Sequence, residues 1–257
     1  MLRNPSTTAQ AIADWIQSYF LSSLPKATAV VGISGGKDSA VSAALCVRAL
    51  GAERVLGVMM PNGVQTDIAD SRSVIAHLGI ASICVNIGAV SEAFAASVPT
   101  SEGFFEATGK RALLGEAAIN FPARLRMTTL YAIAQSLPEG GLVINTCNRS
   151  EDWVGYSTKF GDAAGDLSPL ADLTVTEVRQ LGHALGLPKH LVEKTPSDGL
   201  SGLSDEDKLG FTYAALDDYL ESGRCTDEAL RARIDRLHQM NLHKLAPMPH
   251  FIKRAID

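Results

Sequence analysis

Cysteine is scarce in this sequence, and no arrangement of cysteine and histidine has the spacing of a metal site. The four cysteines are widely separated: Cys46, Cys84, Cys147 and Cys225. They include no Cys-x-x-Cys pair, which argues against a zinc site and favours reduced thiols. The segment 1–19 has the spacing of an amphipathic helix and lacks the apolar core of a signal peptide or a membrane span. We therefore expect a cytoplasmic protein.

Charge of one sign is not concentrated anywhere along the chain. The formal net charge is −5, and the lysines and arginines are scattered. Proteins that bind long nucleic acids usually carry a basic face, so we expect no nucleic-acid partner. A small charged substrate fits this composition better.

The apolar pattern alternates between strand-like and helix-like segments, with no linker, repeat or low-complexity tract between residues 27 and 190. The expected strands are 27–33, 54–60, 81–87 and 141–145. The expected helices are 1–19, 40–50, 66–78, 112–136 and 174–185. This alternation predicts an α/β fold, a Rossmann-like doubly wound parallel sheet with helices on both faces and a site at the carboxyl ends of its strands.

Two of the expected helices have apolar faces that can be read from the sequence. The N-terminal helix is expected to bury one face, made of Ile12, Trp15, Ile16 and Tyr19. The long helix 112–136 carries Leu125, Leu130 and Ile133, which fit either the core or a subunit interface.

The first expected strand runs directly into the sequence Ser34-Gly-Gly-Lys-Asp-Ser39. Two glycines permit a tight turn whose backbone amides, with the following helix N-terminus, bind anions. The common ATP-binding loop does not fit, because only three residues separate Gly32 from Gly36 and Asp38 stands where that loop has a hydroxyl. We predict a phosphate-binding loop, with a surface turn as the alternative, formed by Gly32, Ile33, Ser34, Gly35, Gly36, Lys37, Asp38 and Ser39. Asp38 is the expected magnesium ligand.

This string resembles the loop of the PP-loop ATP pyrophosphatases, which cleave ATP between its α and β phosphates and transfer AMP to an oxygen. A second string, Asn120-x-x-Ala-Arg-x-Arg-Met127, resembles the signature of the ammonia-dependent NAD synthetases within that superfamily. The resemblance implies that Arg124 binds deamido-NAD. From spacing alone, an equally good interpretation is that one of Arg124 and Arg126 is solvated and the other forms a surface ion pair. Pro122 favours a helix that begins there.

The resemblance continues from Gly141 to Asp166. A carboxylate after the fourth strand can meet Asp38 across the sheet, and two carboxylates with phosphate oxygens suit Mg²⁺. Glu151 is the expected second ligand. The resemblance implies these further roles: Thr146 contacts ATP, Lys159 and Asp166 contact deamido-NAD, and Asp162 lines the substrate side. Turn formation beside Gly161 and Gly165 is the alternative for the two aspartates.

The match extends to the C-terminal region. Ser197 stands where a threonine commonly contacts ATP, and His243 with Lys244 resembles the pair that closes over deamido-NAD; a solvated tail helix is the alternative. Two positions depart from the family pattern. Val175 replaces a lysine that binds ATP in many members, and Asn145 replaces a glycine.

The implied function is that of a ligase, the ATP-dependent amidation of deamido-NAD with ammonia at the last step of NAD biosynthesis. The products are NAD, AMP and pyrophosphate, formed through an adenylated intermediate. Mg²⁺ is the expected cofactor, and the expected catalytic residues are Lys37, Asp38 and Asp162. The alternatives are another PP-loop amidation or thiolation and a non-catalytic nucleotide-binding module.

The organisation that follows is one NAD synthetase-like domain over residues 1–257. It comprises an N-terminal helix 1–23, a nucleotide-binding core 27–190 and a C-terminal helical and lid region 191–257. The segments 99–110 and 199–205 are expected to be loops that close over the substrates. The family implies a homodimer. Glutamine-dependent relatives carry a glutaminase domain, for which this chain has no room, so ammonia is used free or comes from a partner subunit.

Overall fold

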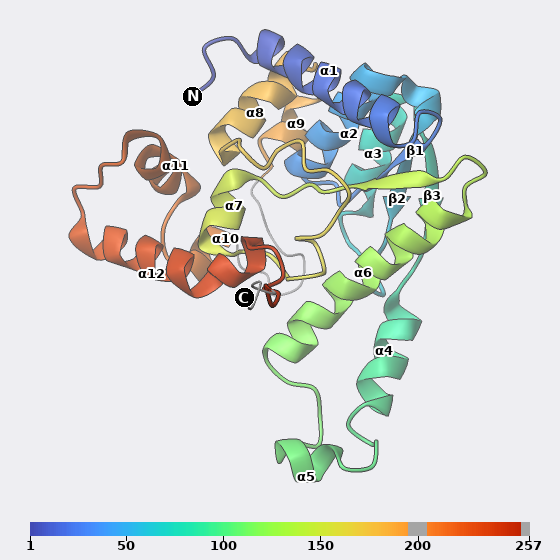
Figure 1. The fold of residues 1–257 in the computed structure, drawn as a ribbon, viewed down its shortest axis with the longest axis vertical. Coiled ribbons are helices and arrows are strands. Elements are labelled where there is room, and N and C mark those ends of the chain that lie inside the picture. The colour runs from blue at the N-terminus through green and yellow to red at the C-terminus, as the bar shows by residue number, and fades with distance from the viewer. Residues whose placement is uncertain (195–204, 253–257) are drawn as a thin grey trace, which may run out of the picture.

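The computed structural model describes residues 1–194 and 205–252. Its described residues form a four-stranded sheet, in which every strand is parallel to its neighbours and the order is β3-β2-β1-β4. The strands are β1 (Thr28–Gly32), β2 (Val55–Met59), β3 (Ala81–Cys84) and β4 (Gly141–Ile144). Helices cover both faces, which confirms the predicted fold class (Figure 1).

The helices of the described part surround the sheet and then continue away from it. They are α1 (Pro5–Ser23), α2 (Lys37–Leu50), η1 (Ala52–Arg54), α3 (Ile68–Leu78), α4 (Gly88–Ser97), α5 (Phe104–Thr108), α6 (Glu116–Ser136), α7 (Arg149–Val154), α8 (Val175–Ala184), α9 (Lys189–Val192), α10 (Asp205–Leu209), α11 (Tyr213–Ser222) and α12 (Glu228–Leu245). Because α5 lies inside segment 99–110, the expectation of a loop without a helix there was wrong. Its closure over the substrates stays a prediction, and residues 199–204 of the second segment lie outside the described residues.

One face of the sheet is covered by α1, α2 and α8 (Figure 1). The buried face of α1 consists of Ala9, Ala13, Ile16 and Phe20. The prediction that Trp15 belongs to the buried face was wrong, because this side chain is 45% exposed. The small alanines let α1 lie close to α2, whereas the large rings of Trp15 and Tyr19 sit toward its edge. Ile12 and Tyr19 pack only partly against this core.

The other face of the sheet is covered by α6, which buries Met127, Leu130 and Ala134 against β1 and β4. Leu125 and Ile133 are partly buried in the same cluster, so of the two alternatives these residues belong to the core.

The long helix α6 begins before its proline. It begins at Glu116 and contains Pro122, so the prediction of a start at Pro122 was wrong. Phe121 stacks on Phe94 of α4 with ring centroids 3.8 Å apart, and this contact holds the first turns of α6 despite the hydrogen bond that proline removes. Figure 1 shows α4, α5 and these first turns projecting away from the sheet.

A separate apolar cluster joins α7, α11 and α12 beside the sheet. It includes Val154, Phe211, Tyr213, Leu216 and Ile234, together with Val175 at the start of α8. This cluster attaches the C-terminal helices to the carboxyl end of β4. The strand order therefore brings the ends of β1 and β4 together, with α12 close by.

Candidate active site

The turn after β1 has the geometry of an anion-binding loop. Gly35 has a φ of +85°, and a Cβ there would lie 2.9 Å from Cβ of Asp70 and 3.0 Å from the backbone nitrogen of Ser71. Glycine is therefore required at this position. The loop is braced internally, because Ser34 and Ser39 hydroxyls lie 3.2 Å apart and the amide of Gly36 donates to Ser34 Oγ.

The helix after the loop begins at Lys37, three residues earlier than the predicted segment 40–50. Its N-cap is Gly36, and no side chain caps it. The first amides of an uncapped helix are unsatisfied donors at the positive end of the helix dipole. This arrangement suits a phosphate group at the turn.

The charged residues of the loop pair with each other. Lys37 is 2% exposed, and its Nζ donates to Oδ2 of Asp38 at 2.8 Å. Burial lowers the pKa of Lys37, but the negative charges of Asp38 and Glu151 outweigh burial, so the pKa lies above its ordinary value. Lys37 therefore stays charged beside the two carboxylates.

Asn148 connects the two predicted magnesium ligands. Its Nδ2 donates to Oδ1 of Asp38 at 3.0 Å, and its Oδ1 accepts the amide of Glu151 at 3.1 Å. The Glu151 carboxylate in turn accepts the amide of Asn148, which completes a capping box at the start of α7. The structure thus brings Asp38 and Glu151 to one place from different strand ends.

The chemistry of this pair fits Mg²⁺. Burial, and then the charge of Asp38, raises the pKa of Glu151 well above its ordinary value. Two half-buried carboxylates that repel each other are stabilised by a hard divalent cation, and Mg²⁺ often takes only one or two carboxylates with substrate phosphates and water. Residues 1–194 and 205–252 contain no cluster of three or more His, Cys, Asp and Glu side chains suited to a metal.

The segment after β4 is held by Asn145, which is buried. Its Nδ2 donates to the carbonyls of Asp162 and Ala164, and its Oδ1 accepts the amide of Cys147 and the hydroxyl of Ser168. Thr146 lies between these anchored residues and is half-buried. Burial, and then the charges of Glu151 and Asp162, raises the pKa of Cys147 well above its ordinary value. Cys147 is therefore a neutral thiol and a poor nucleophile, which argues against the thiolation alternative.

The basic residues assigned to deamido-NAD gather beside this segment. Arg124 Nε donates to the carbonyl of Lys159 at 3.2 Å, and Lys159 Nζ donates to the carbonyl of His243 at 2.7 Å. Lys244 Nζ donates to the carbonyls of Gly155 and Ser157. Residues from α6, the loop after α7, and α12 thus form one basic cluster.

Arg126 lies apart from that cluster. Its Nε donates to the carbonyl of Met60 at the end of β2, and burial lowers its pKa. The spacing suggested a solvated arginine or a surface ion pair, but Arg126 is half-buried and bonded to the backbone.

The two aspartates of segment 158–166 have different surroundings. Asp162 is exposed, and its Oδ1 accepts the amide of Thr158 at 2.9 Å, as in the turn alternative. Asp166 is half-buried and bonded to the sheet: Oδ2 accepts the amide of Val143 at 2.7 Å, and Oδ1 accepts the hydroxyl of Tyr131 at 3.2 Å. Both carboxylates therefore have structural partners, and their contact with substrate stays a prediction. Ser197 lies outside the described residues.

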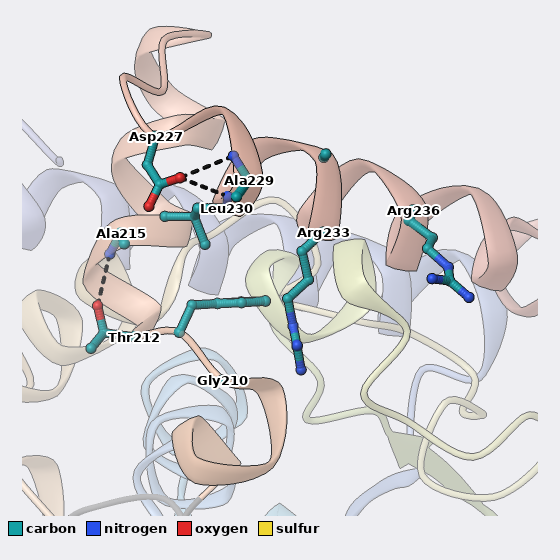
Figure 2. A pocket seen from close by; sticks show the side chains of 10 residues that line it. Gly210, Thr212, Ala215, Asp227, Ala229, Leu230, Arg233 and Arg236 are labelled. Carbon is teal, nitrogen blue, oxygen red and sulfur yellow. Dashed lines mark hydrogen bonds between the residues drawn. The ribbon is translucent and has the colours of Figure 1, made fainter.

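A pocket of about 720 Å³ lies away from the phosphate loop, between α12 and the turn before α11 (Figure 2). Its lining contains none of the predicted site residues. Asp227 caps α12 and Thr212 caps α11, so these polar groups of the pocket serve the helix starts. Arg233 extends toward Gly210, as Figure 2 shows.

Asn148 is a site residue that was not predicted from the sequence. The spacing Asn148-x-x-Glu151 has the form of a capping box and was a detectable signal for a helix start. The contact of Asn148 with Asp38 spans 110 positions and has no local signal. The bonds of Asn145 were not predicted either; the sequence indicated only that an asparagine replaces the glycine of the family pattern.

The described helices include none long and apolar enough to cross a membrane.

The family model for NAD synthase matches residues 8–255. The chain is 41% identical to the NH(3)-dependent NAD(+) synthetase of Pyrococcus furiosus over 78% of this chain and 74% of that protein. It is 39% identical to the enzyme of the same name from Methanoregula boonei over 87% of this chain and 88% of that protein.

The fold is also similar to a solved structure described as NMN synthetase from Francisella tularensis. The TM-score is 0.82 at 35% identity, and the match covers 96% of this chain and 99% of that chain. A family match over nearly the whole length, with the phosphate loop and the paired carboxylates in place, establishes that this chain belongs to the NAD synthase family.

Proposed function

We propose that this chain amidates deamido-NAD with ammonia at the expense of ATP, giving NAD, AMP and pyrophosphate. The observation that carries the proposal is the meeting of Asp38, from the phosphate loop, with Glu151 through the shared bonds of Asn148. A module that only holds a nucleotide has little need for two such carboxylates. The basic cluster beside them suits a second anionic substrate.

The reaction has two steps at one carboxyl group of the substrate: its oxygen reacts first, and its carbon second. The nicotinate carboxylate attacks the α-phosphorus of ATP and expels pyrophosphate; ammonia then attacks the adenylated carbonyl and expels AMP. Adenylation converts a poor electrophile into one with a good leaving group, so the protein needs no covalent nucleophile. Its contribution is to position the reactants and stabilise charge.

The residues divide this work between the two sides of the site. The amides of the loop and of the first turn of α2, with the hydroxyls of Ser34 and Ser39, bind the pyrophosphate portion of ATP, and Thr146 contacts the nucleotide. Lys37 keeps the carboxylate of Asp38 in place. Asp38 and Glu151 would hold Mg²⁺, which neutralises phosphate charge when bound.

The basic cluster serves the other substrate. Arg124, Lys159, His243 and Lys244 would bind the phosphates and carboxylate of deamido-NAD, and Asp162 would line the same side. The similarity to a protein described as NMN synthetase favours a second candidate substrate, the nicotinate mononucleotide. The same carboxylate chemistry applies to both substrates.

Product analysis of the purified chain tests the function. The reaction contains Mg-ATP and ammonium chloride with either deamido-NAD or nicotinate mononucleotide, and each component is omitted in turn. We expect NAD, AMP and pyrophosphate in equal amounts, and no turnover by Asp38→Ala at unchanged circular dichroism. Turnover of the mononucleotide alone would select the second candidate, and no amide product from either substrate would refute the proposal.

We also propose that the enzyme is a cytoplasmic homodimer that uses free ammonia or ammonia from a separate glutaminase subunit. The four cysteines are free, which is consistent with a reducing compartment. The projecting helices and the segment before α6 expose the apolar side chains of Val90, Phe94, Leu114 and Ile119, which suit a subunit contact. Light scattering on the same preparation measures the mass in solution.

A further inference from the structure

Arg179 on α8 has a buried donor without a partner. Its Nε is inaccessible to solvent and makes no hydrogen bond among the described residues. The side chain as a whole is half-buried, so the rest of the guanidinium remains partly open. An unsatisfied donor on a buried charged group is unfavourable, and a bound group that completes the bonding is one explanation for such a donor in a native protein.

The position of Arg179 is close to the phosphate loop. Helices α2 and α8 pack side by side (Figure 1), and a Cβ on Gly182 of α8 would lie 3.3 Å from Val41 of α2. Arg179 lies one turn before Gly182, and Lys37 lies one turn before Val41. The charge of Arg179 acts on both Lys37 and Glu193. It opposes the rise in the pKa of Lys37, and it adds to the lowering of the pKa of Glu193, which the hydrogen bond with His183 mainly causes. The guanidinium is therefore near the start of α2, where the loop ends.

Two other cations near the loop are already paired. Lys37 donates to Asp38 at 2.8 Å. Lys194 donates to Asp67 and to Asp70 at 2.6 Å each, and Asp70 packs against Gly35. No carboxylate in residues 1–194 and 205–252 forms an ion pair with Arg179. Arg179 is thus a cation whose charge is available to an added anion.

The start of α8 explains why a cation is needed here. Val175 is fully buried in the cluster with Phe211 and Leu216, so this position contributes no charge to the site. Arg179 follows Val175 by four residues and lies on the same side of the helix. A guanidinium reaches further than an ammonium group and binds phosphate with two parallel hydrogen bonds.

We propose that Arg179 binds the outer phosphates of ATP and the pyrophosphate that leaves, in place of the lysine that the family pattern has at position 175. The inference rests on the proposed ATP-dependent reaction. It names a further substrate-binding residue, one that enters the site from α8 and lies outside the loop motif.

The test measures phosphate binding separately from turnover. Isothermal titration calorimetry compares inorganic pyrophosphate and AMP, each with Mg²⁺, on the wild-type chain and on Arg179→Met, and kinetics gives the KM of Mg-ATP and of deamido-NAD. We expect Arg179→Met to weaken pyrophosphate binding and raise the KM of ATP about 10-fold to 100-fold, the usual effect of losing a charge-assisted hydrogen bond. AMP affinity and the KM of deamido-NAD should change less than about twofold, and Arg179→Lys should recover part of the loss.

Arg231→Met is the matched control, because Arg231 is an exposed arginine on α12. It should leave all four quantities unchanged. Unchanged pyrophosphate affinity in Arg179→Met overturns the inference, as does an equal loss for pyrophosphate and AMP, since that would indicate a general structural role. If Arg179→Met does not fold by circular dichroism, Arg179→Gln decides by the same criteria. Absence of turnover by the wild-type chain would refute the proposed function. Pyrophosphate binding needs no turnover, so unchanged binding in Arg179→Met would refute the role of Arg179 separately.

Discussion

Asn148 is fully buried and makes two separable contributions, one to the start of α7 and one to Asp38. Asn148→Ser retains an N-cap oxygen of similar strength, but its hydroxyl is too short to reach Asp38. Asn148→Ala removes both contributions. The lost bond to the Asp38 carboxylate is worth about 1.5–3 kcal/mol, and the lost cap adds about 1 kcal/mol. We therefore expect the free energy of unfolding to fall by about 2 kcal/mol in the serine variant and by about 3 kcal/mol in the alanine variant.

Urea denaturation followed by circular dichroism measures both changes at constant m-value. The KM for Mg²⁺ in the amidation assay is the second measurement, because Asp38 loses the donor that orients it, and the KM should rise in both variants. A serine variant as stable as wild type would show that the contact with Asp38 contributes nothing. Equal destabilisation of the serine and alanine variants would show that the cap contributes nothing.

Two further predictions concern the surroundings of the loop. Gly35→Ala should lower the free energy of unfolding by about 2–4 kcal/mol, because it combines a positive φ with a clash against Asp70, and it should abolish ATP binding by calorimetry; near-wild-type stability would contradict the clash. The hydrogen bond from Lys194 is the main cause that lowers the pKa of Asp67, so its stabilisation is complete above the unfolded pKa of about 3.9 and is lost as pH falls through the lower folded value. The difference in urea midpoint between wild type and Asp67→Asn should be constant from pH 7 to about 5 and shrink progressively below about 4; a difference as large at pH of about 3 as at pH 7 would contradict the assignment.

The local parts of this site were predictable because their signals are local. Two glycines between a β-branched strand and a helix specify the loop, and strand-helix alternation specifies a parallel sheet. The same reasoning failed in part at α1, where Ile16 is buried as expected but Trp15 is exposed, and the buried face also includes Ala9, Ala13 and Phe20. It also failed at Pro122, because the stacking of Phe121 on Phe94 extends α6 across a proline. Side-chain packing between distant segments decided both outcomes.

The roles of individual polar residues were harder to predict, since they depend on partners far away in the sequence. Asp166 and Asp162 carry the same group four residues apart, yet Asp166 bonds to the sheet and Asp162 is exposed. The register of β4 against the following segment produces this difference, because Leu167 pairs with Ile144 and directs the carboxylate of Asp166 inward. The pattern of residue types along the chain does not predict that register.

Asn145 links the two halves of the site. Its side chain holds the carbonyls of Asp162 and Ala164, while its Oδ1 fixes the amide of Cys147, so the end of β4 and segment 158–166 are held together. Cys147 reinforces this link, because its Sγ donates to the carbonyl of Asp162 at 3.2 Å. Asn148 and Glu151 follow the end of β4, on one side of these bonds. Lys159 and its basic neighbours lie on the other side, with segment 158–166. A glycine at position 145 has no side chain to make these bonds. We therefore expect Asn145 to fix the predicted phosphate side relative to the basic side, which would favour an in-line attack between two bound anions.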